Sequence, residues 1–362
     1  MKILYITSDA IEKPSCGCAQ RSFLLYKALC KLGEVTVFNP DLIGDGKWTR
    51  RILGVPFRKL TKVARWPYGP PQLGTYDAVI CRYLWSAAEV QAWKNGPCFV
   101  DIDDFPLQAY DLVESKRLPR VLRPIGRILV KVWQRYCLSK CCGVWVANRD
   151  DLAKIQVKGL KKDVLPNLAL PPKADYRVDA PQKRQLMTVG WMDHRPNVEG
   201  IEWFLHAIWP KVHARWPDLS YVIAGRGLSE KQKAEFESAP MVKVLGFVED
   251  LDALYAESLA VVAPILSGAG TCIKVIEAGL HGRTCLATPV AARGQTPHEG
   301  LALFEDANAL LSLVSDWMGI SEPERQKRQR TILELAEQAN SFDAFSATVS
   351  DVKSQTSKRR LS

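Results

Sequence analysis

The feature of this chain that most restricts its fold is the alternation of short apolar runs with amphipathic stretches. In the first half of the chain the runs are KILYITSD, EVTVFNP, YDAVICRY, PCFVDIDD and GVWVAN. Between most of them lie helix-like stretches such as AQRSFLLYKALCKLG, which ends at Gly33. This alternation predicts a parallel sheet with crossover helices.

A polar, proline-rich segment, PPKADYRVDAPQKRQ, interrupts the alternation before it restarts. The later strand-like runs are QLMTVG, LSYVIAG, VKVLGFV, LAVVAPI and TCLATPV. A chain of 362 residues is also too long for one compact core. We therefore expect an α/β fold of two Rossmann-like domains, residues 1–170 and 186–340, which face each other across a cleft and are joined by a linker, residues 171–185. Residues 341–362 are expected to form a helix that returns toward the N-terminal domain and frays at its end.

Charge and hydropathy restrict the partners and the location. No run approaches the roughly 20 apolar residues that a membrane-spanning helix needs, and a strand-like run occupies the place of a signal peptide. We therefore expect a cytoplasmic protein with its ten cysteines reduced. Residues 1–170 hold 27 Lys and Arg against 15 Asp and Glu, whereas the remainder holds 22 against 24. This asymmetry predicts an anionic partner for the first half: a membrane surface, a phosphate-bearing substrate or a nucleic acid.

A glycine-rich turn opens a predicted helix in the stretch SGAGTCIKVIEAGLHG, Ser267 to Gly282. At about 100° per residue, Lys274, Glu277 and His281 fall on one side of this helix, opposite its apolar residues. The glycines can direct backbone N–H groups at an anion, and Lys274 adds positive charge at the end of the helix that is already positive. This placement favours a diphosphate ligand; a solvated polar face on a surface helix is the alternative.

Glycines also follow four successive strand-like runs of the second half, at Gly190, Gly225, Gly246 and Gly268. Ligands of parallel α/β sheets bind beyond the carboxyl ends of the strands, and glycine there lets a ligand come close to the backbone. The pattern predicts a binding site along this edge of the second domain.

Four segments of the second half resemble, in order and spacing, the C-terminal half of retaining nucleotide-sugar glycosyltransferases with the GT-B fold. The branch that they resemble is that of the bacterial surface-polysaccharide enzymes (glycosyl transferases group 1, family four). The segments are VGWMDHRPNVEGIEWF, VIAGRG, VKVLGFVEDLDALYAES and VVAPILSGAGTCIKVIEAGLHGRTCLAT. In the first half, PSCGCAQRSFLLYKAL resembles the glycine loop and first helix of that family, and VLPNLAL resembles its element before the linker.

The resemblance implies a metal-independent enzyme that uses a nucleotide-diphosphate sugar, UDP or GDP, as co-substrate and needs no other cofactor. The sugar would pass to a hydroxyl of a surface glycan with retention of anomeric configuration. A lipid-linked acceptor, as in the biosynthesis of lipopolysaccharide or exopolysaccharide, is the expected partner.

The resemblance also assigns residues to the donor. Glu277 matches the acid that holds the ribose hydroxyls of the nucleotide, and a carboxylate suits this task because it can accept from both hydroxyls. Phe247 and Val248 match the loop beside the base, and Gly17 matches the loop of the first domain that closes over the donor. The turn whose amides meet the diphosphate or the donor sugar corresponds to Gly268, Ala269, Gly270 and Thr271. The remaining candidates for donor binding are Gly190, His194 and Gly225.

Two departures from the family pattern bear on the donor and on catalysis. The E-x7-E motif of the family would require an acid at position 269, where this chain has Ala269. The usual Arg and Lys after the first strand of the second domain are missing, which leaves His194, Arg195 and Lys274 as substitutes. Because charge develops on the departing diphosphate, Lys274 is the principal candidate for the catalytic cation and Arg195 is the second.

Two acids in the first domain are candidates for the acceptor. Asp103 and Asp104 stand at the carboxyl end of the fourth strand-like run, and either would orient the acceptor hydroxyl. Helix capping or turn formation by aspartate is the alternative. The spacing of Cys and His residues predicts no metal site.

Two stretches of the first domain are basic and contain no acid: Lys47–Arg65, with seven basic residues, and Lys116–Lys140, with eight. The second holds a stripe of Arg120, Arg123, Arg127, Lys131 and Arg135. Lying largely away from the stripe are Ile125, Ile128, Leu129, Val132, Trp133 and Tyr136. Basic stripes edged with tryptophan suit an anionic bilayer, here the inner face of the cytoplasmic membrane. A solvated helix face above a core face is the alternative.

Other functions remain open at this point. A sugar-nucleotide epimerase of GT-B fold would need no basic acceptor surface, and a phosphorylase would need a pyridoxal lysine in a much longer chain. A nucleic-acid binder fits the net charge of +10, but the charge lies on an α/β domain and the glycine loops would have no role. Transfer to a nucleic acid or another soluble anionic acceptor stays as the alternative.

Overall fold

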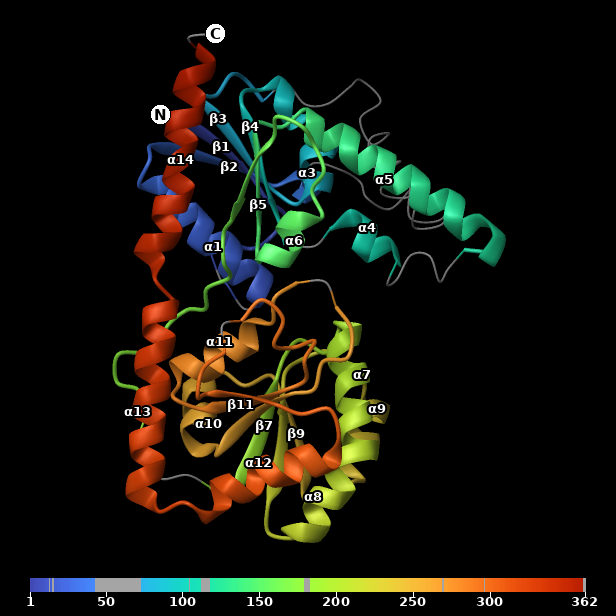
Figure 1. Ribbon diagram of the computed structural model, residues 1–362, viewed down its shortest axis with the longest axis vertical. Helices are drawn as coiled ribbons and strands as arrows, with labels where there is room; N and C mark the ends of the chain where they lie inside the picture. The colour runs from blue at the N-terminus through green and yellow to red at the C-terminus, as the bar shows by residue number, and fades with distance from the viewer. Residues whose placement is uncertain are drawn as a thin grey trace. The chain divides into compact units, whose positions relative to one another are not determined.

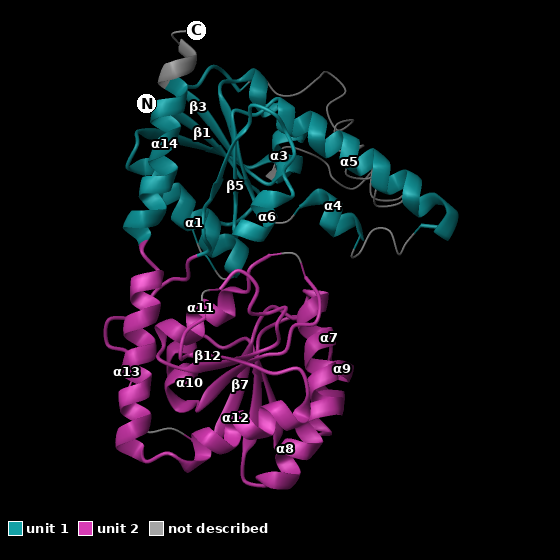
Figure 2. Ribbon diagram, viewed as in Figure 1, with its two compact units in different colours: residues 1–167, 342–362 teal, residues 168–341 magenta. Residues whose placement is uncertain are grey.

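The computed structural model describes residues 1–12, 14, 16–42, 73–103, 105–111, 118–178, 183–268, 270–295 and 297–360. It divides the chain into two compact units, which Figure 2 colours separately. Unit 1 comprises Met1–Asn167 and Phe342–Ser362, and unit 2 comprises Leu168–Ser341. The expected stretch Lys47–Arg65 lies outside the described residues.

Unit 1 is built on a six-stranded sheet in the order β2-β1-β3-β4-β5-β6, in which all neighbours are parallel. Its strands are β1 (Lys2–Ile6), β2 (Glu34–Phe38), β3 (Ala78–Arg82), β4 (Cys98–Ile102), β5 (Gly143–Val146) and β6 (Lys161–Val164). Strands β3, β4 and β5 are buried along their whole length, which explains their continuous apolar runs. Strand β1 lies between β2 and β3, so the strand order reverses beside it.

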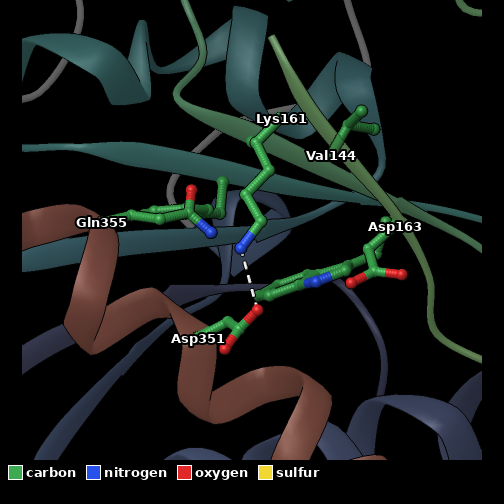
Figure 3. A pocket seen from close by; sticks show the side chains of 8 residues that line it. Val144, Lys161, Asp163, Asp351 and Gln355 are labelled. Atoms are coloured by element: carbon green, nitrogen blue, oxygen red, sulfur yellow. Dashed lines mark hydrogen bonds and ion pairs between the residues drawn. The ribbon is translucent and has the colours of Figure 1, made fainter.

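Helices flank the sheet of unit 1, and α5 runs outward from it, as Figure 1 shows. They are α1 (Gly17–Cys30), α3 (Leu84–Glu89), α4 (Pro106–Ala109), α5 (Arg123–Ser139), α6 (Arg149–Ala153) and α14 (Phe342–Arg360), with short 3-10 turns η1 (Pro40–Leu42), η3 (Ala92–Lys94) and η6 (Arg120–Leu122). The C-terminal helix α14 packs against α1. An ion pair of 2.8 Å between Lys161 of β6 and Asp351 also ties α14 to the sheet (Figure 3). Residues 342–360 are therefore an integral part of unit 1.

Unit 2 repeats the architecture with the order β12-β11-β10-β7-β8-β9, again with parallel neighbours. Its strands are β7 (Gln185–Val189), β8 (Ser220–Ala224), β9 (Val242–Gly246), β10 (Ala260–Ala263), β11 (Thr284–Ala287) and β12 (Leu301–Leu303). Its helices are α7 (Arg195–Trp203), the π-helical η7 (Phe204–Ile208), α8 (Trp209–Arg215), α9 (Glu230–Glu237), α10 (Leu251–Glu257), α11 (Ile273–Leu280), α12 (Ala307–Gly319) and α13 (Glu322–Ala339). Here the strand order reverses beside β7, which lies between β8 and β10.

The expected fold class, α/β with two Rossmann-like domains, is confirmed by these two sheets. Residues 171–178, part of the expected linker, pack on unit 2. The Tyr176 hydroxyl donates to the His281 carbonyl oxygen (2.7 Å), and Lys173 Nζ lies 3.1 Å from Asp250 Oδ1. The division between the units falls after Asn167 and again before Phe342.

Helix α7 approaches the loop after β10 so closely that only glycine fits at the contact. A Cβ atom at Gly200 would lie 2.0 Å from the Pro264 carbonyl oxygen, which belongs to the backbone and cannot rotate away. This contact holds the middle of α7 against the loop after β10, at the carboxyl edge of the sheet.

We predict that Gly200→Ala lowers the free energy of unfolding by about 1–3 kcal/mol, because the added methyl group overpacks a rigid contact. The matched control is Gly319→Ala in α12, where a Cβ would have no atom within 4 Å. That variant should be neutral or more stable by up to about 1 kcal/mol. Urea unfolding followed by tryptophan fluorescence measures both; equal effects of the two substitutions would contradict the prediction.

Candidate functional site

The carboxyl edge of the unit 2 sheet carries the four glycines that the sequence singled out. Gly190 follows β7, Gly225 follows β8, Gly246 ends β9, and Gly268 lies in the loop after β10. The Gly190 amide donates to the Ala224 carbonyl (3.0 Å), and the Gly225 amide donates to the Gly246 carbonyl (2.7 Å). The strand order reverses beside β7, and ligands of open α/β sheets bind at the carboxyl edge where the order reverses.

The ammonium of Lys274 lies beside Gly190 at this edge. Lys274 stands in the first turn of α11, is only 8% exposed, and donates from Nζ to Asn197 Oδ1 (2.8 Å). Asn197 is itself held by the Trp191 carbonyl, to which Nδ2 donates (2.8 Å). A Cβ at Gly190 would come within 3.1 Å of Lys274 Nζ, so glycine makes room for the ammonium.

No ion pair among the described residues includes Lys274. A buried ammonium whose partner is a neutral amide has lost water and gained no opposite charge, which is unfavourable. Such an arrangement is expected where an anionic ligand binds. The alternative was that this side of α11 is a solvated polar face. It is wrong for Lys274 and for His281, because both side chains are buried.

His281 has a structural environment. It is buried, its ring stacks on Tyr255 with centroids 4.0 Å apart, and its Nε2 lies 2.9 Å from Asp252 Oδ1. Glu277, one turn before it, is half-buried, and its Oε2 accepts from the Tyr255 hydroxyl at 3.4 Å. Burial, followed by the charge of Glu277, raises the pKa of Tyr255 far above its usual value, so the phenol stays protonated and donates to the carboxylate.

The turn before α11 has two polar features that point to a ligand. The Thr271 hydroxyl oxygen is buried and finds no hydrogen-bond partner among the described residues. Arg293, in the loop after β11, donates from its guanidinium to the carbonyl oxygens of Gly268 (3.2 Å) and Gly270 (3.1 Å). Because N–H and C=O point in opposite directions across a trans peptide, the Thr271 amide faces away from Arg293. Ala269 lies outside the described residues.

Arg293 is not among the site residues predicted from the sequence. Its partners Gly270 and Gly268 lie 23 and 25 residues earlier in the chain, and no local pattern indicates that pairing. Trp191 was also missed. Its ring lies 4.5 Å from the Arg226 guanidinium carbon, at the end of β7.

The structure separates the two candidate cations. The Arg195 side chain is 74% exposed and pairs with Glu199 of its own helix at 2.6 Å, whereas Lys274 is buried at the glycine edge. His194 precedes α7, and partial desolvation together with the positive charge of Lys274 lowers its pKa. His194 is therefore a neutral imidazole near pH 7.

An aromatic side chain is presented to solvent at the far end of the same edge. Phe247 directly follows β9 and is 68% exposed, while Val248 after it is half-buried against the core of unit 2. An exposed ring of this kind offers a stacking surface for a planar base.

The carboxyl edge of the unit 1 sheet holds a second polar cluster, centred on Asp101 at the end of β4. Arg21 of α1 binds both carboxylate oxygens of Asp101 (2.9 and 2.6 Å), and Arg82 at the end of β3 donates to Oδ2 (2.6 Å). All three side chains are fully buried. Burial alone would raise the pKa of Asp101, but the two guanidinium groups hold it below its usual value.

Around this buried centre lie groups that reach the surface. Arg82 is 3.5 Å from Asp9 Oδ2 and 3.5 Å from Asp103 Oδ2, and these two side chains are 16% and 13% exposed. The Tyr83 hydroxyl donates to Asp9 (3.4 Å), and Asn167 donates to Asp103 (3.4 Å).

The structure thus places Asp103 in an ion-pair cluster. Helix α4 begins after Phe105 without a side-chain cap, so Asp103 does not have the capping role of the alternative. Asp104 lies outside the described residues. Gly17 is the first residue of α1. Asp9, Arg82 and Tyr83 were not predicted.

Two absences complete the description of the site. In the part of the chain that the structure describes, no group of three His, Cys, Asp or Glu side chains is placed to hold a metal ion. None of the described helices is both long enough and apolar enough to span a bilayer.

Comparison with solved structures shows that the chain shares the GT-B fold of two Rossmann-like domains. HepE of Anabaena, in complex with UDP and glucose, gives a TM-score of 0.64 at 13% identity and covers 98% of this chain and 99% of its own. The α,α-trehalose-6-phosphate synthase of Burkholderia multivorans gives 0.68 at 13% identity and covers 99% and 98%. TarM of S. aureus gives 0.59 at 13% identity over 82% of this chain, which spans 58% of the length of TarM.

The family comparison is more specific for unit 2. Residues 183–318 match the family model described as Glycosyl transferases group 1. This match relates unit 2 to the glycosyl transferases of group 1. No curated protein matches the sequence.

We predict that Lys274→Met raises the pKa of His194, because it removes a neighbouring positive charge that disfavours the imidazolium. Desolvation of the ring remains, so the pKa should stay below the usual value for histidine. The chain has five histidines, so NMR titration of the imidazole protons, with His194→Gln for assignment, measures the change. Lys243→Met at the amino end of β9 is the control and should leave the titration unchanged. A His194 titration that ignores Lys274→Met would show that the two groups do not interact.

Proposed function

We propose that this protein is a retaining glycosyltransferase that moves a sugar from a nucleotide-diphosphate donor, UDP or GDP, to a hydroxyl of a surface-glycan acceptor carried on a lipid. The observation that carries the proposal is the buried, unneutralised ammonium of Lys274 among the glycines of the unit 2 edge. The family match of residues 183–318 supports glycosyl transfer as the reaction.

In this proposal the donor lies along the carboxyl edge of unit 2. The diphosphate binds Lys274 and the amides of the Gly268–Thr271 turn, with the Thr271 hydroxyl as a further donor. The ribose binds the half-buried carboxylate of Glu277, and the base lies near Phe247 and Val248. Gly190 and Gly225 let the ligand approach, and His194 is a hydrogen-bonding group beside the diphosphate. HepE, which has this fold, binds UDP.

The chemistry requires that the diphosphate leave with its developing charge stabilised. Lys274 is already desolvated and held by Asn197, so it needs little reorganisation to meet that charge. Arg195 takes the lesser, second role, because its side chain is solvent-exposed and paired with Glu199. The departing phosphate itself accepts the proton of the attacking hydroxyl. Retention is supported by the fold that the chain shares with a trehalose-6-phosphate synthase studied for glycosyl transfer with retention.

The acceptor is assigned to unit 1, at the edge that carries Asp9 and Asp103. Carboxylates accept hydrogen bonds from sugar hydroxyls, and Asp103, with Asp104 beside it in sequence, would orient the attacking hydroxyl. Gly17 lies at the start of α1, which contributes Arg21 to the same cluster.

We predict that Glu277→Gln weakens donor binding by about 10- to 100-fold, because a charge-assisted hydrogen bond to the ribose is lost. The amide keeps the size of the side chain and can still accept from Tyr255, so the fold should be unaffected. The donor is first identified by thermal shift with a panel of UDP- and GDP-sugars, and its affinity is then measured by calorimetry. A lowered unfolding midpoint with unchanged donor affinity would assign Glu277 a structural role instead.

We predict that Lys274→Met lowers turnover by about 100-fold or more, because the cation meets charge that develops in the transition state. Donor affinity should fall by less than turnover does. Initial rates of donor-sugar hydrolysis or transfer at saturating donor give turnover, and calorimetry gives affinity. Arg195→Met should reduce turnover less, and Lys243→Met serves as the neutral control. Weaker donor affinity with unchanged turnover at saturating donor for Lys274→Met would limit this residue to uniform binding of the ground state and the transition state.

A further inference from the structure

Helix α5 and the turn before it expose an unusual number of large apolar side chains. Ile128 is 61% exposed and Val132 is 62% exposed. The full set of exposed apolar residues here is Val121, Leu122, Ile125, Ile128, Leu129, Val132 and Tyr136. Six apolar residues were expected to lie away from the basic stripe, and the alternative was that they pack on the core. Five of them are exposed, so this alternative is wrong for those five. Only the sixth, Trp133, is partly buried. A contiguous apolar surface of this kind is rare unless it binds something.

A narrow stripe on the opposite side attaches α5 to unit 1. Val130, Cys137 and Leu138 are buried, and the Trp133 ring stacks on Trp85 with centroids 5.5 Å apart. At about 100° per residue, Ile128 and Val132 project from the side opposite Val130. Figure 1 shows the helix running outward from the sheet, with its amino-terminal end farther from it. The apolar residues of the outer side therefore do not pack on the core that the described residues of unit 1 form.

Positive charge borders the exposed apolar side. The sequence from Leu118 to Lys140 contains six basic residues and no acid. Arg123 donates to the Leu118 carbonyl (3.2 Å), and Arg127 pairs with Asp111 (2.9 Å), so these two are occupied within unit 1. The remaining basic residues, all exposed, are Arg120, Lys131, Arg135 and Lys140.

We propose that α5, together with Val121 and Leu122, lies in the interface of an anionic membrane. Its exposed apolar side chains insert among the acyl chains, and Arg120, Lys131 and Arg135 bind the headgroups. The helix has 17 residues, about 26 Å at 1.5 Å per residue, and lies in the plane of the membrane without crossing it. Only a partner that is apolar in its interior and anionic at its surface matches both features of the helix.

Other partners match only one of the two features. A nucleic acid would pair with the basic residues and leave the apolar side chains in water. A second copy of the chain would cover the apolar side chains but bring two sets of like charges together, with no acid between Leu118 and Lys140 to compensate. The membrane is therefore the partner that the helix itself favours, and this inference does not depend on the donor chemistry.

The test uses the full chain and vesicles of phosphatidylcholine, with or without phosphatidylglycerol. We expect wild-type protein to sediment with the anionic vesicles at low salt and to be partly released at high salt, since screening weakens only the charge contribution. The variant Ile125→Ser, Ile128→Ser, Val132→Ser should bind at least tenfold more weakly although its charge is unchanged. The variant Lys131→Glu, Arg135→Glu should lose binding as well. A matched control, Met241→Ser with Leu335→Ser, removes exposed apolar side chains of unit 2 and should bind as wild type does.

Several results would overturn the inference. Wild-type protein that ignores anionic vesicles at low salt would do so, as would a serine variant that binds them normally. Binding to a duplex oligonucleotide in place of vesicles would identify a nucleic-acid surface. A wild-type dimer that the serine substitutions dissociate would identify a contact between copies. Thermal unfolding and the donor-induced thermal shift are measured on every variant, so loss of folding and failure of the proposed donor chemistry are each distinguished from loss of membrane binding.

Discussion

Strand order decides where both units place their chemistry. In a parallel sheet every strand end that leads into a helix lies at the same edge, and a crevice opens only where successive connections leave in opposite directions. In unit 2 this happens beside β7, and Gly190, Asn197 and Lys274 meet there. In unit 1 it happens beside β1, the strand that leads to Asp9, next to Arg82 at the end of β3. Two unrelated sets of side chains therefore occupy equivalent places in two copies of one architecture.

The two edges differ in how their charges are balanced, and this difference fits their proposed ligands. Unit 1 surrounds two buried arginines with three carboxylates, and the groups that reach the surface, Asp9 and Asp103, are acidic. Such an edge is suited to neutral sugar hydroxyls. In unit 2 Lys274 is buried, and no carboxylate of the described residues pairs with it. That edge is suited to an anion, as the diphosphate of a nucleotide sugar would be.

The sequence predicted the parts of the molecule that depend on local pattern. Alternating apolar runs and amphipathic helices indicate parallel sheets because burial on both faces and crossover connections leave that signature. The sequence also predicted the glycines after the strands of unit 2 and the turn before α11, because a glycine that follows a strand-like run is itself a local pattern. Arg293 and Arg82 could not, because their partners depend on how distant segments meet. Arg21 and Asp101 are 80 residues apart, and nothing near either residue indicates the pairing.

Helix α5 shows a different limit of sequence patterns. Its periodicity separates basic residues from apolar ones, but it does not determine which side packs on the protein. The packed stripe of Val130, Cys137 and Leu138 is itself apolar, so the helix has two apolar sides and a basic flank. Only the three-dimensional structure distinguishes the apolar side that holds the helix in place from the side that remains exposed.

The choice of Asn197 as the partner of Lys274 follows from the need to position a charge without cancelling it. An aspartate at the same place would hold the ammonium at least as firmly, but it would neutralise the charge and compete with an incoming diphosphate. The amide orients Nζ through one neutral oxygen and is itself fixed by the Trp191 carbonyl. A side chain at position 190 would crowd this pair, because a Cβ there would lie 2.9 Å from Asn197 Nδ2 and 3.1 Å from Lys274 Nζ. In the proposed function, positioning by a neutral group would keep this desolvated cation available to the diphosphate, which is the condition for stabilising charge on a leaving group.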